Sequence, residues 1–588
     1  MSQKKRFKYW IPLALILLEL AAIEYFVLTW LQMDLGNFLG GLKFGDHFVV
    51  GVKFLAFFLG FLVLEFFFVL KSHPKNKKSF LIPLLLTHLP WLFGFLLPVV
   101  VSMTFPAPHN GLDRKADVLF GLMVVTHLFL FCGWFLWRAR NNGWKVSTNF
   151  GLVALFFFIT TTLFTTQCDL SGDEPHYLLM AYSLIHDGDL DLTNNYQKQD
   201  YKEFYHRGIL EPQGLDHITV SSLYSYHPLG PVLLVLPGFK LAGRLGASLT
   251  MALLAALTLF LTLKVLEETG AKGWSLQAIG AIGLFSSPLL LFAGLIYPEI
   301  PTACLIALSL WLFLRKRWGW LGLCQGLLLW MHNRNVLLVI PFLLITLYEI
   351  QKREFGWPEK AGKLVVGFVP LVIALVGYFF YLYGVVTPLG AHNEPFTSLF
   401  PLHRFFTGFL GLVLDQECGL WFHFPVFAVM VTGGVLLAHS RDPLKLLILG
   451  TVGFFYFFMS FYENLGLTPA TRYMVGITPL LLIGIYPALE KMRKWDHWAI
   501  FTAFSFAAGV LVNWVLAAIP WMRYNQLQGQ NWMLKIAGGF IHLPLADWEP
   551  SFQAPEIQMK SYLLSAFWVL GSIVLTALFI KDEKKAKR

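Results

Sequence analysis

Charged residues are scarce in this chain of 588 residues, since Asp, Glu, Lys and Arg together make up only 14% of it. Apolar residues take their place: 56% of the chain is hydrophobic, 56 residues are phenylalanine, and the mean hydropathy is +0.61. This composition does not describe a soluble core. Apolar runs of roughly 20 residues are long enough to cross a bilayer as helices. The sequence therefore predicts an all-α polytopic membrane protein.

Cysteine is also rare, with five residues in the whole chain. This number is too small for a disulfide framework. Only Cys168 and Cys418 fall on the predicted outer face, and buried free thiols are the favoured interpretation for all five. Acidic residues are fewer than basic ones, which gives a net charge of +10. In a membrane protein this excess indicates basic cytoplasmic loops, so no nucleic-acid partner is expected.

The basic residues occur in nine clusters between the apolar runs, and these clusters hold 30 of the 45 lysines and arginines. All of them fall on one side if the chain crosses the membrane sixteen times with both ends inside. The first run, 10–31, is too long for a signal sequence and is predicted to be retained. We expect an integral protein of the plasma membrane, the inner membrane if bacterial, with its site on the periplasmic, or extracytoplasmic, face.

Three regions follow from this topology. Residues 1–146 are predicted to form a four-helix N-terminal extension. Residues 147–520 form the core, with an outer loop at 168–228. Residues 521–588 form another outer loop, the last transmembrane helix and a basic cytoplasmic tail.

The stretch SGDEPHYLLMAYSLIHDGDLDL, residues 171–192, opens the first large outer loop. Asp173 is placed to be an N-cap, Pro175 suits a first turn, and Asp187-Gly188 ends the helical pattern. The helix is too short and too polar to span, so we expect it to lie in the interface, as does a second segment at 228–245. If Asp173 and Glu174 have no catalytic role, they are expected only to cap this helix and to stabilise its dipole. DGDLDL is predicted to be a turn rather than a calcium loop.

Several segments together resemble the GT-C membrane glycosyltransferases, and most of all the protein O-mannosyltransferases and the lipid A aminoarabinose transferases. They are the Asp-Glu pair that opens the outer loop, the two interfacial segments, and three further stretches: SSPLLLFAGLIYPEIPTACLIAL, LDQECGLWFHFPVF and LTPATRYMVGITPLLL. The resemblance covers roughly 147–520 and implies a GT-C-like helix bundle. It departs from the family at His227-Pro228, where relatives often carry Lys-Pro-Pro.

The resemblance implies transfer of a sugar from a polyprenyl-phosphate-linked donor to a glycan, lipid or protein acceptor on the outer face. Asp173 then acts as the general base, and Glu174 is a supporting acid or a metal ligand together with His176. No cofactor is required by the sequence, although a divalent metal is possible. The donor phosphate needs fixed hydrogen-bond donors and cations, which are expected from Arg472, Arg334, Tyr473 and His227. Glu299, Glu417 and His176 are expected to support these groups.

Other classes of protein stay open at this stage. A transporter or flippase of lipid-linked sugars predicts charges along a midplane pathway, and Glu19, Glu24, Lys53 and Glu65 lie at such depths in the N-terminal extension. An ion pair between Glu24 and Lys53 explains two of them. A glycan ligase or polymerase also uses polyprenyl carriers, but typically with a large late outer loop. A scaffold without catalysis remains if the acids only cap helices.

Overall fold

The computed structural model describes residues 143–166, 169–216, 222–386, 401–462, 470–523, 529–552 and 559–586, together with some residues between 125 and 136. The described parts belong to one compact unit of the chain. Most of the predicted N-terminal extension, with its expected pair of Glu24 and Lys53, lies outside the described residues. So does Cys168, whereas Cys418 is a buried free thiol.

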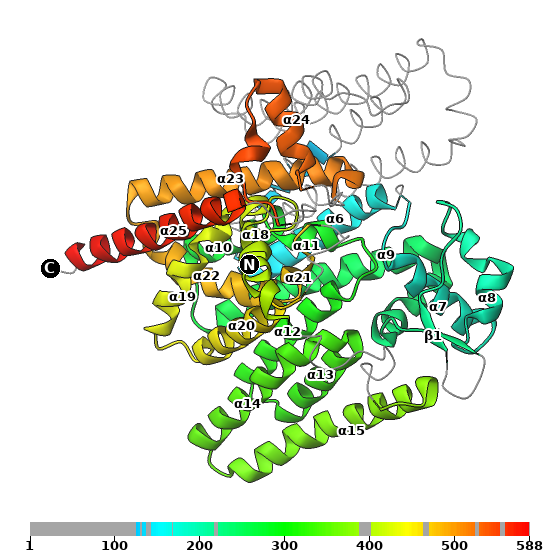
Figure 1. The fold of residues 1–588 in the computed structure, drawn as a ribbon. Helices are drawn as coiled ribbons and strands as arrows, with labels where there is room; N and C mark the ends of the chain where they lie inside the picture. Colours follow the sequence, from blue (N-terminus) through cyan, green and yellow to red (C-terminus); the bar gives the residue numbers. More distant parts are fainter. Residues whose placement is uncertain are drawn as a thin grey trace, which may run out of the picture. The chain divides into compact units, whose positions relative to one another are not determined.

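The described chain is built from helices, with one short hairpin of strands β1 (Gly214–Asp216) and β2 (Leu223–Ser225). Within it, seven helical segments are long and apolar enough to cross a membrane. They contain α6 (Val146–Thr165), α9 (Leu229–Glu268), α10 (Gly273–Phe285) with α11 (Pro288–Phe292), α14 (Val336–Arg353), α15 (Trp357–Tyr383), α23 (Asp496–Ala518) and α25 (Met559–Ala586). The chain is an all-α polytopic integral membrane protein, as its composition predicts (Figure 1).

Shorter helices complete the bundle: α12 (Glu299–Leu314), α13 (Trp318–Met331), α17 (Phe405–Leu414), α18 (Leu420–His423), α19 (Met430–Ala438), α20 (Lys445–Met459), α21 (Arg472–Val475), α22 (Thr478–Met492) and α24 (Trp532–Ile541). The sequence predicts spans from 147 onward at about 147–166, 246–264, 273–295, 299–315, 319–332, 335–350, 363–383, 419–438, 445–462, 472–488, 498–518 and 561–580. Each of them contains a helix. The run at 419–438 is broken into α18, a 3-10 turn at Pro425–Val429 and α19. Helix α17 was not predicted, because its ten residues are too few for a spanning pattern.

The two segments expected in the interface take different forms. The first is α7 (Glu174–His186), which ends at Asp187 before Gly188 with φ +78°, so DGDLDL begins with a turn as expected. The second is the first part of α9, which breaks at Ala242 and Gly243 before the spanning part continues. Gly243 has φ +54°, a conformation that side chains with a Cβ disfavour. The break therefore lies within three residues of the boundary that the sequence indicates.

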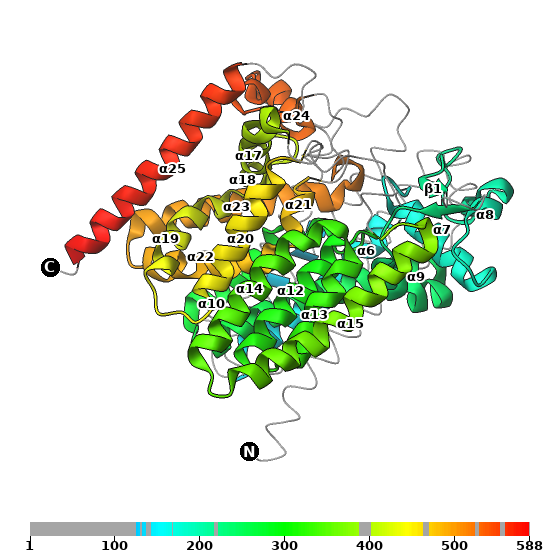
Figure 2. The same cartoon turned by 60° about the horizontal axis from the view of Figure 1, so that its bottom comes forward.

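Segment 171–216, with the N-terminal part of α9, forms a small apolar core of its own. Tyr177, Leu178 and Met180 of α7 pack there with Tyr201 and Val235. Helix α8 (Thr193–Lys198) and the hairpin lie beside α7, at the same side of the molecule in both views (Figures 1 and 2). The predicted outer loop is thus a folded cap rather than a flexible connection.

Among the described residues, several helix ends that adjoin basic clusters are joined by polar contacts. Ser147 donates to Glu267, which joins the start of α6 to the end of α9. Arg315, at the end of α12, pairs with Glu268 at 2.7 Å. His497, at the start of α23, lies 3.3 Å from Asp582 near the end of α25. This clustering of helix ends agrees with the alternating topology, and it leaves the opposite helix ends for the site.

Candidate active site

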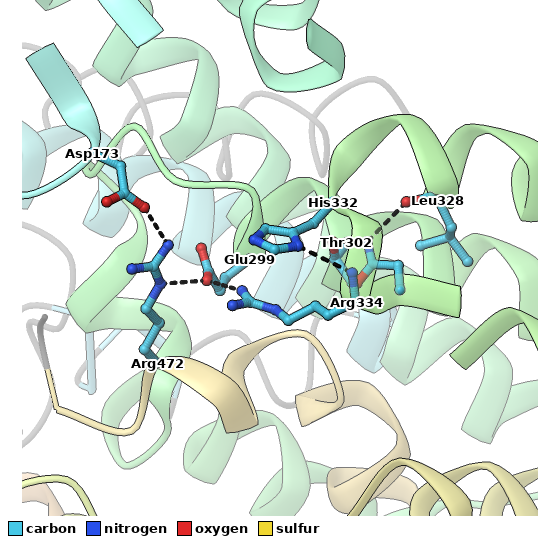
Figure 3. A network of polar contacts seen from close by, with 8 residues as sticks. Asp173, Glu299, Thr302, Leu328, His332, Arg334 and Arg472 are labelled. Atoms are coloured by element: carbon cyan, nitrogen blue, oxygen red, sulfur yellow. Dashed lines mark hydrogen bonds and ion pairs between the residues drawn. The ribbon is translucent and has the colours of Figure 1, made fainter. Parts of the chain in front are cut away.

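Four charged side chains from distant parts of the sequence form one network (Figure 3). Arg472 donates through Nε to Glu299 Oε1 at 2.7 Å and through a terminal nitrogen to Asp173 Oδ2 at 2.5 Å. Arg334 forms an ion pair with the same Glu299 oxygen. The sequence predicted all four as site residues, and the structure brings them together.

Each member of the network sits where a helix begins. Asp173 precedes α7, Glu299 is the first residue of α12, and Arg472 is the first residue of α21. Thr471, just before Arg472, has φ +63° and donates its backbone N–H to Cys418 O at 3.2 Å. The positive φ redirects the chain at this point, so α21 starts with its arginine facing the two acids.

The short turn between α13 and α14 positions Arg334. His332 accepts the backbone N–H of Arg334 through Nδ1 at 3.2 Å. Asn335 donates to Thr302 Oγ1 at 2.8 Å and to Leu328 O at 2.9 Å, which fixes the turn against α12 and α13. The sequence MHNRN therefore serves as a rigid holder for one arginine.

Burial of the network is uneven. Glu299 and Arg472 expose only 2% and 7% of their side chains, while Arg334 exposes 13% and Asp173 24%. Two carboxylates balance two guanidinium groups, which is what buried charges require. Asp173 is the most accessible of the four, so it is the acid that a bound molecule can reach.

The pKa of Asp173 lies below its usual value. Burial alone raises the pKa, but the positive charge of Arg472, the hydrogen bond from Arg472 and the charge of Arg334 outweigh burial. The carboxylate is therefore ionised at neutral pH.

Two tyrosine rings lie against the guanidinium groups of the arginines. The guanidinium carbon of Arg472 lies 4.6 Å from the ring centre of Tyr297, and that of Arg334 lies 4.9 Å from the ring of Tyr473. At these distances the rings stabilise the cations. Tyr297 also donates its hydroxyl to Ser171 O at 3.1 Å. Tyr473 was predicted, but Tyr297 was missed, although it stands in the YPEIP turn beside Glu299.

The side chain of Asp173 does not cap α7. It occupies the N-cap position, yet its backbone is helical and no side-chain capping hydrogen bond forms. The capping interpretation of Asp173 is therefore wrong, because its carboxylate turns to Arg472 instead.

Glu174 binds backbone amides. Its carboxylate accepts the backbone N–H groups of Ile296 at 3.0 Å and Ser171 at 3.4 Å, and it is 2% exposed. It thereby ties the start of the cap to the turn before α12. Since that turn carries Tyr297 and Glu299, Glu174 helps to place Asp173 opposite Arg472.

His176 and His227 stack on each other beside Asp173, with ring centres 5.3 Å apart. His176 Nδ1 lies 2.9 Å from the hydroxyl of Tyr196, and His227 Nε2 lies 2.9 Å from Oε1 of Gln213. Burial lowers the pKa of His176 to about 3 and that of His227 to about 4. Both rings are neutral at pH 7, so the positive charge beside Asp173 comes from the arginines.

Glu417 belongs to a group of side chains, with Asp415 and Gln416, that binds the backbone of segment 529–552. It accepts the backbone N–H of Gly529 at 2.9 Å, while the neighbouring Asp415 accepts that of Phe552 at 2.6 Å. Gln416 donates to Ala546 O at 3.0 Å. The LDQECG motif thus holds segment 529–552, and through Cys418 O it also holds the backbone before Arg472. The role of Asp415 and Gln416 was missed by the sequence analysis.

The predicted metal ligands do not form a metal centre. In the part of the chain that the structure describes, no group of three His, Cys, Asp or Glu side chains is placed to hold an ion. Glu174 binds backbone amides and His176 binds Tyr196, so neither is arranged as a ligand.

No model of a protein family matches the chain, and no curated protein matches it. Among solved structures, it is similar to ArnT from Cupriavidus metallidurans bound to undecaprenyl phosphate, with 16% identity and a TM-score of 0.40 over 74% of this chain and 72% of that chain. A TM-score this low assigns no role to any side chain, so each role rests on the contacts described above.

Proposed function

We propose that this protein transfers a sugar from a polyprenyl-phosphate-linked donor to an acceptor on the extracytoplasmic face of the membrane. The observation that carries the proposal is the Asp173–Arg472–Glu299–Arg334 network. It combines one accessible, ionised carboxylate with two fixed cations at the end of a membrane helix bundle. These are the groups that such a transfer needs: a base for the acceptor and cations for the phosphate that leaves.

Asp173 is the general base of the proposed reaction. An acceptor hydroxyl attacks the anomeric carbon, its proton passes to the Asp173 carboxylate, and the bond between the anomeric carbon and the phosphate oxygen breaks. The phosphate leaves with the electron pair of that bond. General-base assistance of this kind contributes ~100- to 10,000-fold to a rate.

Arg472 and Arg334 stabilise the phosphate as its charge grows. A guanidinium group presents planar pairs of donors to phosphate oxygens. In the described structure, one terminal nitrogen of Arg472 binds Asp173. A donor phosphate that takes this nitrogen frees the carboxylate for the acceptor proton, so donor binding and base activation are coupled. Glu299, which binds both arginines, keeps them together.

The proposed location rests on the positions of the helix ends. The network lies about 24 Å along α12 from the basic cluster at its other end, given 1.5 Å per helical residue. Basic clusters mark the cytoplasmic side, so we place the network on the extracytoplasmic side. There the donor phosphate can reach the network while its polyprenyl tail stays in the bilayer. The acceptor is a glycan, a lipid or a protein.

The topology is tested by labelling a single residue of the cap. Gln197 is exposed in α8. Gln197→Cys should react with a membrane-impermeant thiol reagent added to intact cells or spheroplasts. Arg441→Cys, in the exposed turn between α19 and α20, is the matched control and should react only after the membrane is opened. Labelling in the reverse order contradicts the assignment of the site to the outer face.

The phosphate contact is tested by Arg472→Lys. Lysine keeps the charge but has a single nitrogen, which cannot serve Glu299 and Asp173 or phosphate together. Loss of one charge-assisted hydrogen bond reduces the rate roughly 10- to 100-fold. We expect a higher KM for the lipid-linked donor, a lower kcat and measurable residual transfer.

Arg493→Lys is the control for that change, because Arg493 pairs with Glu490 at the opposite end of the bundle. Its donor kinetics should match those of the parent. If Arg472→Lys also keeps the parental KM and kcat, Arg472 does not bind the phosphate.

A further inference from the structure

A second group of charged side chains surrounds a cavity of about 320 Å³ at the basic end of the bundle. Two turns form it: the turn between α12 and α13, and the turn between α14 and α15. The helices that these turns connect lie side by side in both views (Figures 1 and 2). The lining residues are Lys316, Arg317, Trp318, Gly319, Trp320, Glu354, Lys360 and Lys363.

Lys316 adopts an unusual backbone conformation at this cavity. The N–H of Arg317 donates to Leu312 O and that of Lys316 to Phe313 O, each at 3.0 Å, which is the Schellman arrangement at the end of a helix. The residue at this position has a left-handed conformation, and Lys316 has φ +55°. Glycine is the usual residue there because a Cβ is disfavoured. A lysine at such a position indicates that its side chain makes a contact that glycine could not make.

The use of that side chain is visible in its contact. Lys316 Nζ lies 2.5 Å from Glu354, and Lys360 Nζ lies 2.6 Å from the other oxygen of the same carboxylate. Hydrogen bonds from the two lysines lower the pKa of Glu354. A single carboxylate, 10% exposed, thus fixes two ammonium groups at the rim of the cavity. Arg317 and Lys363 add two more cations to the lining, and Lys363 pairs with Glu359 at 2.6 Å. Four cations thus face two carboxylates, so positive charge exceeds negative charge there.

The surroundings of the cavity are those of a membrane surface. Trp320 and Trp357 expose 65% and 45% of their area, and Phe355 is fully exposed. Tryptophan is enriched at the level of lipid headgroups. Next to the cavity begins the exposed apolar face of α15, which includes Val366 and Ile373. A molecule with an anionic head and apolar tails matches both parts of this surface.

We propose that this cavity binds the phosphate-containing headgroup of an anionic phospholipid, with the acyl chains along α15. Basic pockets between transmembrane helices on the cytoplasmic side bind acidic headgroups, and each lysine or arginine close to the lipid contributes about fivefold in affinity. The lipid is a site ligand rather than a substrate, and the proposal does not depend on sugar transfer.

The test uses the full chain purified in detergent, with dioleoyl phosphatidylglycerol as the probe and dioleoyl phosphatidylcholine as the neutral comparison. Bound lipid is counted by native mass spectrometry during a titration. Phosphatidylglycerol should bind at least about tenfold more tightly than phosphatidylcholine, and millimolar inorganic phosphate should not displace it. Equal binding of the two lipids overturns the proposal, and displacement by phosphate shows a site for soluble anions instead.

Two variants locate the binding in the cavity. Arg317→Gln with Lys363→Gln should weaken phosphatidylglycerol by roughly 25-fold, since two cations are lost. The control, Arg441→Gln with Lys494→Gln, removes the same charge from the same end but outside the cavity, and should retain the parental affinity. Equal weakening by both pairs means that only the net charge matters, which contradicts a built site.

Lys316→Gly separates ligand binding from folding. Glycine suits φ +55°, so the variant should keep or raise the melting temperature of the delipidated protein while binding phosphatidylglycerol about fivefold more weakly. If Lys316→Gly binds the lipid as tightly as the parent, Lys316 does not contact the headgroup and the proposal is wrong for this residue.

Discussion

Asp173→Asn should reduce transfer from a polyprenyl-phosphate sugar by at least ~100-fold while the protein remains folded. Asparagine keeps the size of the side chain, and its oxygen can still accept the hydrogen bond that Arg472 donates. It cannot take a proton from the acceptor. Folding should survive because Asp173 provides no side-chain cap to α7, is the most exposed member of the network, and leaves Arg472 its hydrogen bond to Glu299. The measurement is the initial rate of transfer, together with the melting temperature.

Asp169→Asn is the matched control for this change. Asp169 lies four residues earlier in the same loop and forms a half-exposed ion pair with Arg207 at 3.7 Å. Exposed pairs of this kind contribute about 0–1 kcal/mol, so the control should transfer sugar at the parental rate. A folded Asp173→Asn protein that is as active as the control removes Asp173 from the reaction.

Glu299→Gln should have the largest effect on stability. Glu299 Oε1 accepts from Arg472 at 2.7 Å and pairs with Arg334, and its side chain is 2% exposed. Its neutralisation leaves two guanidinium groups with only Asp173 as a counter-charge. Removing one partner of a buried ion pair costs about 3–5 kcal/mol. We therefore expect a clearly lower melting temperature in detergent and a loss of transfer.

Glu268→Gln provides the comparison at the other end of the bundle. Glu268 pairs with Arg315, whose side chain is 52% exposed, so its replacement should lower the melting temperature little. If Glu299→Gln and Glu268→Gln lower the melting temperature by the same small amount, Glu299 is not the centre of the network.

The helices were largely predictable because membrane spans carry their own signal. Apolar runs bounded by basic clusters match α6, α14, α15, α23 and α25. Helix α17 could not be found in this way, since ten apolar residues satisfy neither the length of a span nor a polar periodicity. The break between α18 and α19 was also missed, although Pro425 is a signal for it, since proline disfavours a helical conformation at the preceding Phe424.

The charged members of the site were predictable for a similar reason. Isolated acids and arginines at the ends of apolar runs stand out, and Asp173, Glu299, Arg334 and Arg472 meet as the topology implies. The partners of these groups were not predictable. Asp173 binds an arginine, whereas the adjacent Glu174 binds backbone amides. Which partner a carboxylate meets depends on the direction of its side chain in the folded protein, and two adjacent positions in a sequence do not reveal that direction.

A structure of the full chain with a polyprenyl phosphate bound is the most direct test of the central claim. The proposal predicts phosphate oxygens within hydrogen-bond distance of the Arg472 and Arg334 guanidinium groups, with the carboxylate of Asp173 released from Arg472 and facing the space beside the phosphate. A phosphate bound away from both arginines, with the Asp173–Arg472 pair intact, would contradict it.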